Sequence, residues 1–174
     1  MAFLNFSGPT LTEYEVPTRD PAMAYLANAL TISADPTDEN KLWFTELTTN
    51  KIGMVDRKVP IPFDISSPQK HIILEKGGTA TIKIDVSKTK GAEGSIVNNS
   101  LSFGASGTEV FSGKLMNVTI AFSPEKIDLS KMNETQIVTL TLKDDGIERG
   151  QYVLAVSATD GAVIRTIYME LEVR

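Results

Sequence analysis

The sequence predicts an all-β protein, an antiparallel β-sandwich preceded by a small separate β-sheet. Three observations lead to this fold class. Hydrophobic and polar residues alternate with a period of two over roughly the last 105 residues, turn-forming residues separate these runs, and a proline-rich break precedes them. With 174 residues, 41% of them hydrophobic and 22% charged, the chain can bury a sizeable core.

Each alternating run predicts one strand with a buried side and a solvent-facing side. Residues 79–86 show the pattern most clearly, because four small or apolar residues alternate there with four polar ones. The expected strands are residues 72–74, 79–86, 96–103, 117–122, 138–142, 152–156 and 164–173. Glycine and aspartate indicate turns at residues 77–78, 104–107, 144–146, 150 and 160–161. Short strands at this spacing favour an antiparallel sandwich.

The first 60 residues differ in composition from the rest of the chain. They contain the only tryptophan, Trp43, and residues 21–30 have an alanine-rich core that favours a helix. Prolines follow between residues 60 and 68, and proline withholds a backbone donor and restricts the residue before it. We therefore expect a first domain at residues 1–60, a linker at residues 61–67 and the sandwich at residues 68–174.

The composition excludes several classes of function. The chain has no cysteine and one histidine, which excludes disulfide scaffolds, thiolate metal sites and multi-histidine metal centres built within it. A net charge of -5 argues against a nucleic-acid partner. No run of 18 apolar residues occurs, so we expect no membrane insertion. The N-terminus lacks the features of a secretion signal, so an exported parent would make this chain a trimmed piece.

Residues 42–46 read L-W-F-T-E and residues 50–56 read N-K-I-G-M-V-D. Together they resemble the blade repeat of the streptogramin (virginiamycin B) lyase-like β-propellers. The resemblance covers residues 11–58, and residues 12–17 are similar to the closing strand of a preceding blade. It implies a magnesium-dependent elimination, for which Glu46 is the one catalytic candidate here. Because the blade contains no histidine, we expect no catalysis within this chain.

The second half carries a different set of motifs. Residues 76–81 read K-G-G-T-A-T, residues 117–124 read N-V-T-I-A-F-S-P, and residues 150–156 read G-Q-Y-V-L-A-V. Residues 68–174 thereby resemble the Ig-like or fibronectin-III-like modules of secreted bacterial and archaeal proteins. The resemblance implies a tyrosine corner at Tyr152. The cysteine pair and sandwich tryptophan of antibody-type domains are absent.

Other chemistry-bearing residues have simpler explanations. Two acidic clusters are weak candidates for calcium: Asp35 and Asp38, with Glu39 and Asn40, and Asp144 and Asp145, with Glu148. Neither has the spacing of an EF-hand loop, and solvated turns explain both. We expect His71 to be a partly exposed strand residue, for which the sequence identifies no partner. A serine-nucleophile elbow is absent, and residues 104–107 are expected to form a flexible turn.

Four of the eight asparagines lie in N-x-[ST] glycosylation patterns: Asn5, Asn98, Asn117 and Asn133. This excess favours an extracellular or cell-surface location, although a Ser- and Thr-rich β protein also produces such patterns by chance.

The leading hypothesis for function is a non-catalytic C-terminal part of a secreted or cell-surface protein. Its Ig-like module would serve as a spacer, adhesion or binding domain, and a partner would contact its loops or add a strand to an exposed edge such as residues 164–173. Expected partners are a protein or carbohydrate at the cell surface, or upstream propeller blades. The alternatives are a fragment of a lyase-like propeller enzyme and a self-assembling structural subunit. No cofactor is expected. Mg and Ca are the only metals for which the sequence offers candidate ligands, and these candidates are weak.

Overall fold

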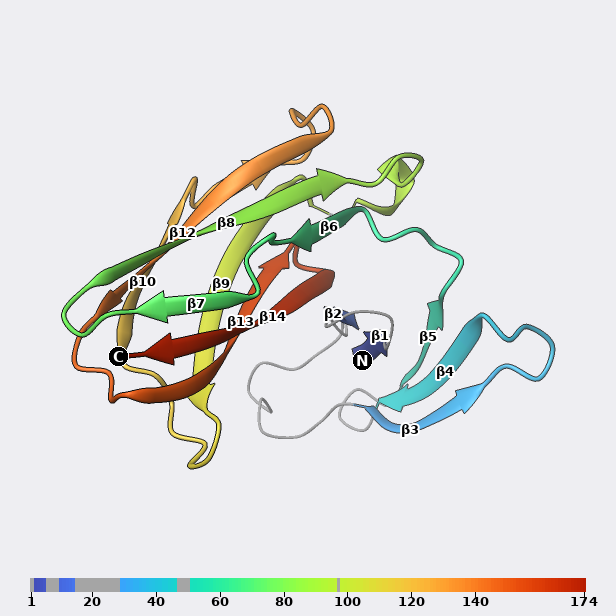
Figure 1. Ribbon diagram of the computed structural model, residues 1–174. Coiled ribbons are helices and arrows are strands. Elements are labelled where there is room, and N and C mark those ends of the chain that lie inside the picture. The colour runs from blue at the N-terminus through green and yellow to red at the C-terminus, as the bar shows by residue number, and fades with distance from the viewer. Residues whose placement is uncertain (1, 6–9, 15–28, 47–50, 97) are drawn as a thin grey trace.

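The computed structural model describes residues 2–5, 10–14, 29–46, 51–96 and 98–174 (Figure 1). Regular structure in these ranges consists of strands and one short 3-10 helix, η2 (Glu93–Ser95). The strands are β1 (Ala2–Asn5), β2 (Thr10–Tyr14), β3 (Ala29–Ala34), β4 (Lys41–Glu46), β5 (Lys51–Asp56), β6 (Phe63–Ser66), β7 (His71–Leu74), β8 (Thr79–Lys88), β9 (Ser100–Glu109), β10 (Val118–Ser123), β11 (Lys126–Asp128), β12 (Thr135–Asp144), β13 (Gly150–Thr159) and β14 (Val163–Val173). No helix in the described ranges is long and apolar enough to cross a membrane.

Two sheets pack against each other to form a sandwich. The larger sheet has the strand order β1-β2-β14-β13-β9-β11, and β7 also pairs with β14. The smaller sheet has the order β10-β12-β8-β6. All of these pairs are antiparallel except β7 with β14, which is parallel. The predicted all-β sandwich is therefore confirmed.

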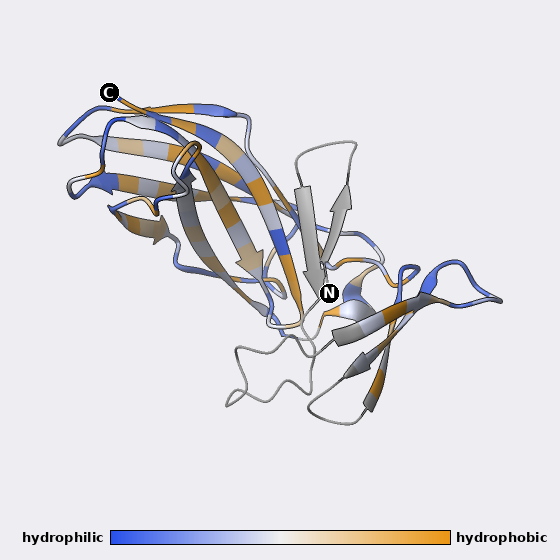
Figure 2. Cartoon of the chain, turned by 90° about the horizontal axis from the view of Figure 1, so that it is seen from below, coloured by the Kyte–Doolittle hydropathy of each residue, from blue (hydrophilic) through white to orange (hydrophobic). Residues whose placement is uncertain are grey.

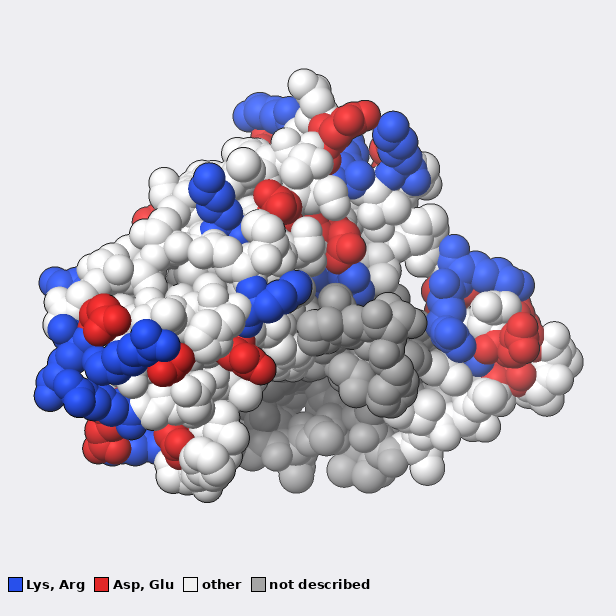
Figure 3. All heavy atoms as spheres, in the orientation of Figure 1, with Lys and Arg blue, Asp and Glu red and all other residues white. Residues whose placement is uncertain are grey.

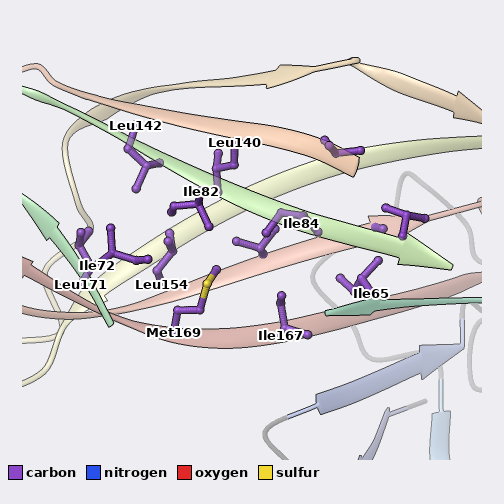
Figure 4. Packing of buried hydrophobic residues seen from close by; sticks show 14 of the residues in the cluster. Ile65, Ile72, Ile82, Ile84, Leu140, Leu142, Leu154, Ile167, Met169 and Leu171 are labelled. Atoms are coloured by element: carbon purple, nitrogen blue, oxygen red, sulfur yellow. The ribbon is translucent and has the colours of Figure 1, made fainter. Parts of the chain in front are cut away.

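The core lies between the two sheets, where the alternating side chains of both meet. Figure 2 shows this alternation as bands of hydrophobic and hydrophilic residues along the sandwich strands. In Figure 4, side chains from β8 and β12 face those from β13 and β14; the labelled members are Ile82, Ile84, Leu140, Leu142, Leu154, Ile167, Met169 and Leu171. Removing this apolar surface from water is the main stabilising term for the sandwich.

The chain changes sheets between β6 and β7. Strand β6 pairs with β8 in the smaller sheet, and β7 pairs with β14 in the larger one. The expected linker at residues 61–67 therefore contains a core strand, whose Phe63 and Ile65 are fully buried. The sequence did not predict this four-residue strand, because the prolines on both sides of it indicate a break in regular structure. The division of the chain into two domains stays a prediction.

Strand β9 differs from its sequence prediction. It begins at Ser100 rather than at residue 96, and it contains residues 104–107, where we expected a flexible turn. Gly107 pairs with Leu154 of β13, and a Cβ on Gly107 would lie 2.6 Å from the Met116 Sδ. This glycine therefore allows close packing within a strand. Glycine occurs both in turns and at such close contacts, so the residue type alone did not distinguish the two.

The N-terminal hairpin of β1 and β2 extends the larger sheet. Strand β2 pairs with β14 along Val163–Ile167, while β7 pairs with β14 further along, at residues 170–173. Residues 12–14 thus lie in the sandwich sheet, and the expectation that they close a propeller blade is wrong. The expected free edge at residues 164–173 is also wrong, because β14 is paired on both sides over most of its length.

Strands β3, β4 and β5 form a separate three-stranded sheet that stands apart from the sandwich in both views (Figures 1 and 2). Phe44 is buried and its ring covers Gly53, since a Cβ there would lie 2.2 Å from the ring Cζ. The expected helix at residues 21–30 mostly lies outside the described residues, and residues 29 and 30 begin β3.

Two side-chain contacts hold the sandwich at its ends and edge. The Tyr152 hydroxyl donates a 2.9 Å hydrogen bond to the Glu148 carbonyl, and this side chain is only 3% exposed, so the predicted tyrosine corner is confirmed. Burial, followed by the nearby Glu148 charge, raises the pKa of Tyr152. At the other end, Arg165 of β14 donates to the Asp64 carboxylate of β6, with Nη2 and Oδ1 2.6 Å apart, and joins the two sheets.

We expect Tyr152→Phe to lower the free energy of unfolding by about 1–2 kcal/mol, because it leaves the Glu148 carbonyl without its donor and adds no cavity. Equilibrium urea denaturation would measure the change. The control is Tyr168→Phe, since the Tyr168 hydroxyl has no hydrogen-bond partner among the described residues. Equal losses in the two variants would contradict a structural role for the corner.

Candidate functional site

The surface of the larger sheet that faces away from the core, here called the outer face, combines polar and hydrophobic side chains. Strand register places Thr108 beside Val153, Val153 beside Glu170, and Glu170 beside His71. Residues directly opposite each other on neighbouring strands point to the same side. All four are exposed, and Val153 is 40% exposed. A continuous row of accessible side chains therefore crosses strands β9, β13, β14 and β7.

Further exposed hydrophobic residues extend this row. Leu115 forms a bridge with Thr108 and so continues the row beyond β9. Val110 donates its N–H to the Gln151 carbonyl at 2.9 Å, which continues the β9–β13 pairing by one residue. On the far edge, Ile73 lies beside Glu172. These three side chains are exposed, although hydrophobic side chains on a sandwich strand usually face the core.

A hollow of about 520 Å³ lies in the outer face. Its lining residues are Lys70, His71, Val153, Tyr168, Met169 and Glu170. Val153 supplies an apolar side chain and Tyr168 an aromatic ring, while the buried Met169 side chain points into the core beneath the hollow. The charged groups come from the edge near β7. The hollow is an open depression of the surface, and its volume would accommodate a side chain of a partner.

His71 lies between two carboxylates of β14. Its Nδ1 is 3.5 Å from Glu170 Oε2, and its Nε2 is 3.3 Å from Glu172 Oε2. Hydrogen bonds from Arg174, and then the charges of Arg174 and His71, lower the pKa of Glu172. The predicted partly exposed strand position is confirmed, but the partners of His71 could not be found from the sequence because they lie about a hundred positions away.

The connection between β9 and β10 folds into a hydrogen-bonded turn, here called the tip, at residues 110–113. Glu109 Oε2 accepts the backbone N–H groups of Phe111 at 3.0 Å and Ser112 at 2.5 Å. Contacts with the Ser112 side chain, and then with these backbone groups, lower the pKa of Glu109. The Phe111 side chain at the end of this turn is 89% exposed. An aromatic residue is thus held out in solvent by an ordered backbone.

Charged residues of both signs are mixed over the surface. Figure 3 shows Lys and Arg gathered at the end of the sandwich near the C-terminus, with Asp and Glu interspersed among them. Lys114, beside the tip, contacts Glu148 at 2.5 Å, and this hydrogen bond and charge raise the pKa of Lys114. The face seen in Figure 3 has no large area of a single sign.

The sequence-predicted residues are not brought together. Glu46 ends β4, in the separate small sheet, and its side chain lies outside what the structure describes. His71 lies in the sandwich. No cluster of three or more His, Cys, Asp or Glu that could hold a metal occurs among the described residues.

The first acidic cluster organises the turn between β3 and β4. Asp35 Oδ1 accepts the Thr37 hydroxyl at 2.6 Å and the Thr37 N–H at 2.8 Å, while Oδ2 accepts the Trp43 indole N–H at 2.8 Å. These hydrogen bonds hold the pKa of Asp35 well below its usual range. Asp38 accepts from Asn40 and Lys58, which lowers its pKa to about 2. Calcium binding here stays a prediction.

The second acidic cluster also stabilises turns. Asp144 accepts the N–H groups of Gly77, Gly146 and Ile147, which lower its pKa, with Gly77 contributing most. The Asp145 side chain accepts from the Thr119 hydroxyl. Both carboxylates thus have structural partners, and calcium binding at this cluster stays a prediction too.

The glycosylation patterns lie at the surface where their side chains are described. Asn98, Asn117 and Asn133 are exposed, whereas Asn5 lies in β1 and its side chain is outside the described set. The Asn117 amide donates to the Asp145 carbonyl at 2.9 Å. A glycan on Asn117 would therefore replace one hydrogen of an amide that already has a partner.

Comparison with known proteins finds no matching family model and no curated protein of similar sequence. Among solved structures, a family 123 glycoside hydrolase from Clostridium perfringens aligns with 64% of this chain at 11% identity and a TM-score of 0.42. The chain spans about a quarter of that enzyme, 26% of its length.

Two further solved structures contain PapD-like or Ig-like domains. The PapD-like domain 7 of human CEP192 aligns with 69% of this chain and 91% of its own length, at 17% identity and a TM-score of 0.37. Dpr2 Ig1-Ig2, solved in complex with DIP-Theta Ig1-Ig3, covers 77% of this chain and 40% of the matched chain, at 8% identity and a TM-score of 0.36. The propeller resemblance has no counterpart among these three.

We expect the fluorescence of Trp43, the only tryptophan, to report on the Asp35 carboxylate. Because the pKa of Asp35 is depressed in the folded state, its stabilising hydrogen bonds are complete above the ordinary value of 3.8 and are lost as the pH falls through the folded-state value. Asp35→Asn should change the emission at neutral pH and remove its acid transition.

The matched control is Asp38→Asn, since Asp38 makes its hydrogen bonds with Asn40 and Lys58, whereas Trp43 donates to Asp35. This variant should retain the acid transition of the tryptophan emission. An unchanged transition in Asp35→Asn would show that the indole hydrogen bond does not form in solution.

Proposed function

We propose that this chain is a non-catalytic binding module of a secreted or cell-surface protein, and that it binds a partner protein through the outer face. The observation that carries this proposal is the hollow of about 520 Å³ lined by Val153, Tyr168 and Met169. A hollow with apolar walls, surrounded by further exposed hydrophobic side chains, is typical of a surface that a partner covers.

The chemistry of the hollow fits the side chain of a protein partner. Val153 can contact an aromatic ring, and the Tyr168 ring can pack against it edge-to-face. Lys70 and Glu170, at the charged side of the hollow, can pair with polar groups flanking that ring. Buried aromatic anchors of this kind dominate the binding energy of many protein interfaces.

The surroundings of His71 support binding rather than catalysis. Its polar partners among the described residues are the carboxylates of Glu170 and Glu172. A general base that activates a nucleophile needs a hydroxyl or thiol within hydrogen-bond reach. The two carboxylates beside His71 instead make it part of a polar cluster at the surface, where a partner can contact it.

We expect an aromatic probe to enter the hollow. In a titration of isotope-labelled protein with N-acetylphenylalanine amide, followed by two-dimensional NMR, the signals of Val153, Tyr168 and Met169 should shift together. Val153→Arg should abolish these shifts, while Ile137→Ala, at an exposed position of the smaller sheet, should leave them unchanged. Shifts spread over the whole surface, or shifts produced only by an N-acetylglucosamine oligosaccharide, would contradict a protein-binding hollow.

The second part of the proposal concerns the longer protein to which this chain would belong. We infer that this chain belongs to a longer, exported protein with further propeller blades. The W-F-T-E residues on β4 and the K-I-G residues on β5, in a small sheet outside the sandwich, support the blades, and the exposed Asn98, Asn117 and Asn133 of the glycosylation patterns support export. A sheet of three strands without covering layers gains little stability alone. The gene sequence upstream of Met1 should encode a secretion signal and more W-F-T-E repeats; neither would be present if the blade pattern arose by chance.

In that setting the enzyme hypothesis applies to the parent rather than to this chain. Glu46 would be one carboxylate of an axial ring, and upstream blades would have to supply the histidines and the other ligands of a magnesium ion.

A further inference from the structure

The outer face contains both halves of a complementary contact. The tip presents Phe111, whose side chain is 89% exposed, and the hollow presents an apolar surface beside Tyr168. The two lie on one sheet: Val110, next to Phe111, pairs with Gln151, which is two positions from Val153 in β13. The same chain therefore carries a protruding aromatic residue and a hollow large enough to hold it.

We propose that the outer face is a homodimer interface, in which Phe111 of each copy occupies the hollow of the other. This inference rests on the proposed function of the outer face and names its partner as a second copy of this chain. In a two-fold arrangement, two sheets pack face to face and each tip meets the opposite hollow, so the contact closes without open-ended growth.

The ordered backbone of the tip favours this contact. Glu109 accepts two N–H groups of the turn, and the Gly113 N–H donates to the Glu109 carbonyl at 2.9 Å. The side chain is therefore presented from a turn that needs little further ordering when it binds. Preorganisation reduces the conformational entropy lost on association, which is a main cost of a small interface.

Charges at the two sites are complementary between copies. Lys114 follows Phe111 by three residues and is accessible to solvent, where it pairs with Glu148 of its own chain. Glu170 lines the hollow, and its side chain is 79% exposed. Insertion of Phe111 would bring Lys114 of one copy to the hollow of the other, where Glu170 lies. Exposed hydrophobic residues Val110, Leu115 and Ile73 surround the contact and would lose water-accessible area in the same step.

Sedimentation velocity across a wide concentration series tests the proposal. The wild-type protein should shift from monomer to dimer as concentration rises, and Phe111→Ala should weaken the association constant about tenfold or more. Val153→Arg should weaken it similarly by placing a charge in the hollow. Ile137→Ala is the matched control, because it removes an exposed hydrophobic side chain from the other sheet.

Mixing the two weakened variants provides the decisive measurement. A heterodimer of Phe111→Ala with Val153→Arg retains one intact contact, formed by the tip of the second variant and the hollow of the first. It should therefore associate more tightly than either variant alone. Dimers in the mixture that are no tighter than those of the separate variants would overturn the reciprocal contact.

The charge pairing has its own test. Lys114→Glu and Glu170→Lys should each weaken the dimer, and the double variant should recover part of the loss. A lack of recovery would overturn this pairing.

Other results would overturn the homodimer itself. These are a wild-type monomer at all concentrations, a dimer that Phe111→Ala leaves intact, growth beyond a dimer, or a monomer that uses Phe111 to bind phosphatidylcholine vesicles. A wild-type monomer whose hollow still binds N-acetylphenylalanine amide would reject self-association while leaving the proposed binding function in place. A wild-type protein that neither dimerises nor binds N-acetylphenylalanine amide would reject the binding function as well.

Discussion

Hydrogen bonding along both edges of β14 is the constraint on which the arrangement of this protein depends. Strand β13 pairs with it over ten residues, while β2 and β7 share the opposite edge. These pairings fix which side chains point inward. Ile167, Met169 and Leu171 enter the core, and the residues between them, including Tyr168 and Glu170, face solvent. The core and the outer face are therefore two consequences of one register, and a shift by one residue would exchange them.

The same constraint explains why the hollow forms where it does. The chain leaves the smaller sheet after β6 and enters the larger one as β7, which begins its pairing with β14 at His71 and places Lys70 at the same edge. Strand β2 covers a different part of this edge, at Val163–Ile167. The hollow lies on the β7 half, where Tyr168 and Glu170 are left accessible. Its floor is rigid because Met169 belongs to the packed core.

The small sheet of β3, β4 and β5 is stabilised differently from the sandwich. Its order relies on local contacts: the Phe44 ring over Gly53, and the Asp35 carboxylate that joins its own turn to the Trp43 indole. Trp43, Ile52 and Met54 are nevertheless exposed on one side of it. Register pairs Trp43 with Met54, which places these two on a common face. The sandwich, by contrast, buries its apolar residues between two layers. The two parts of the chain therefore differ in how much of their apolar surface is buried.

Local pattern alone determined much of this protein. Alternation predicted the strands around residues 79–86, 138–142 and 164–173, because burial on one face of a strand leaves a period of two in the sequence. The Tyr152 corner was implied by the resemblance of residues 150–156 to Ig-like modules. Where local signals conflict with packing, prediction failed: residues 104–107 form a strand because β13 pairs with them, and Phe63 and Ile65 form one despite flanking prolines. Only the tertiary structure decided that His71 meets Glu170 and Glu172 and that Val110, Val153 and Tyr168 share a face. Those neighbours come from strands far apart in the chain, and their register is set by hydrogen bonds between strands that no local sequence pattern encodes.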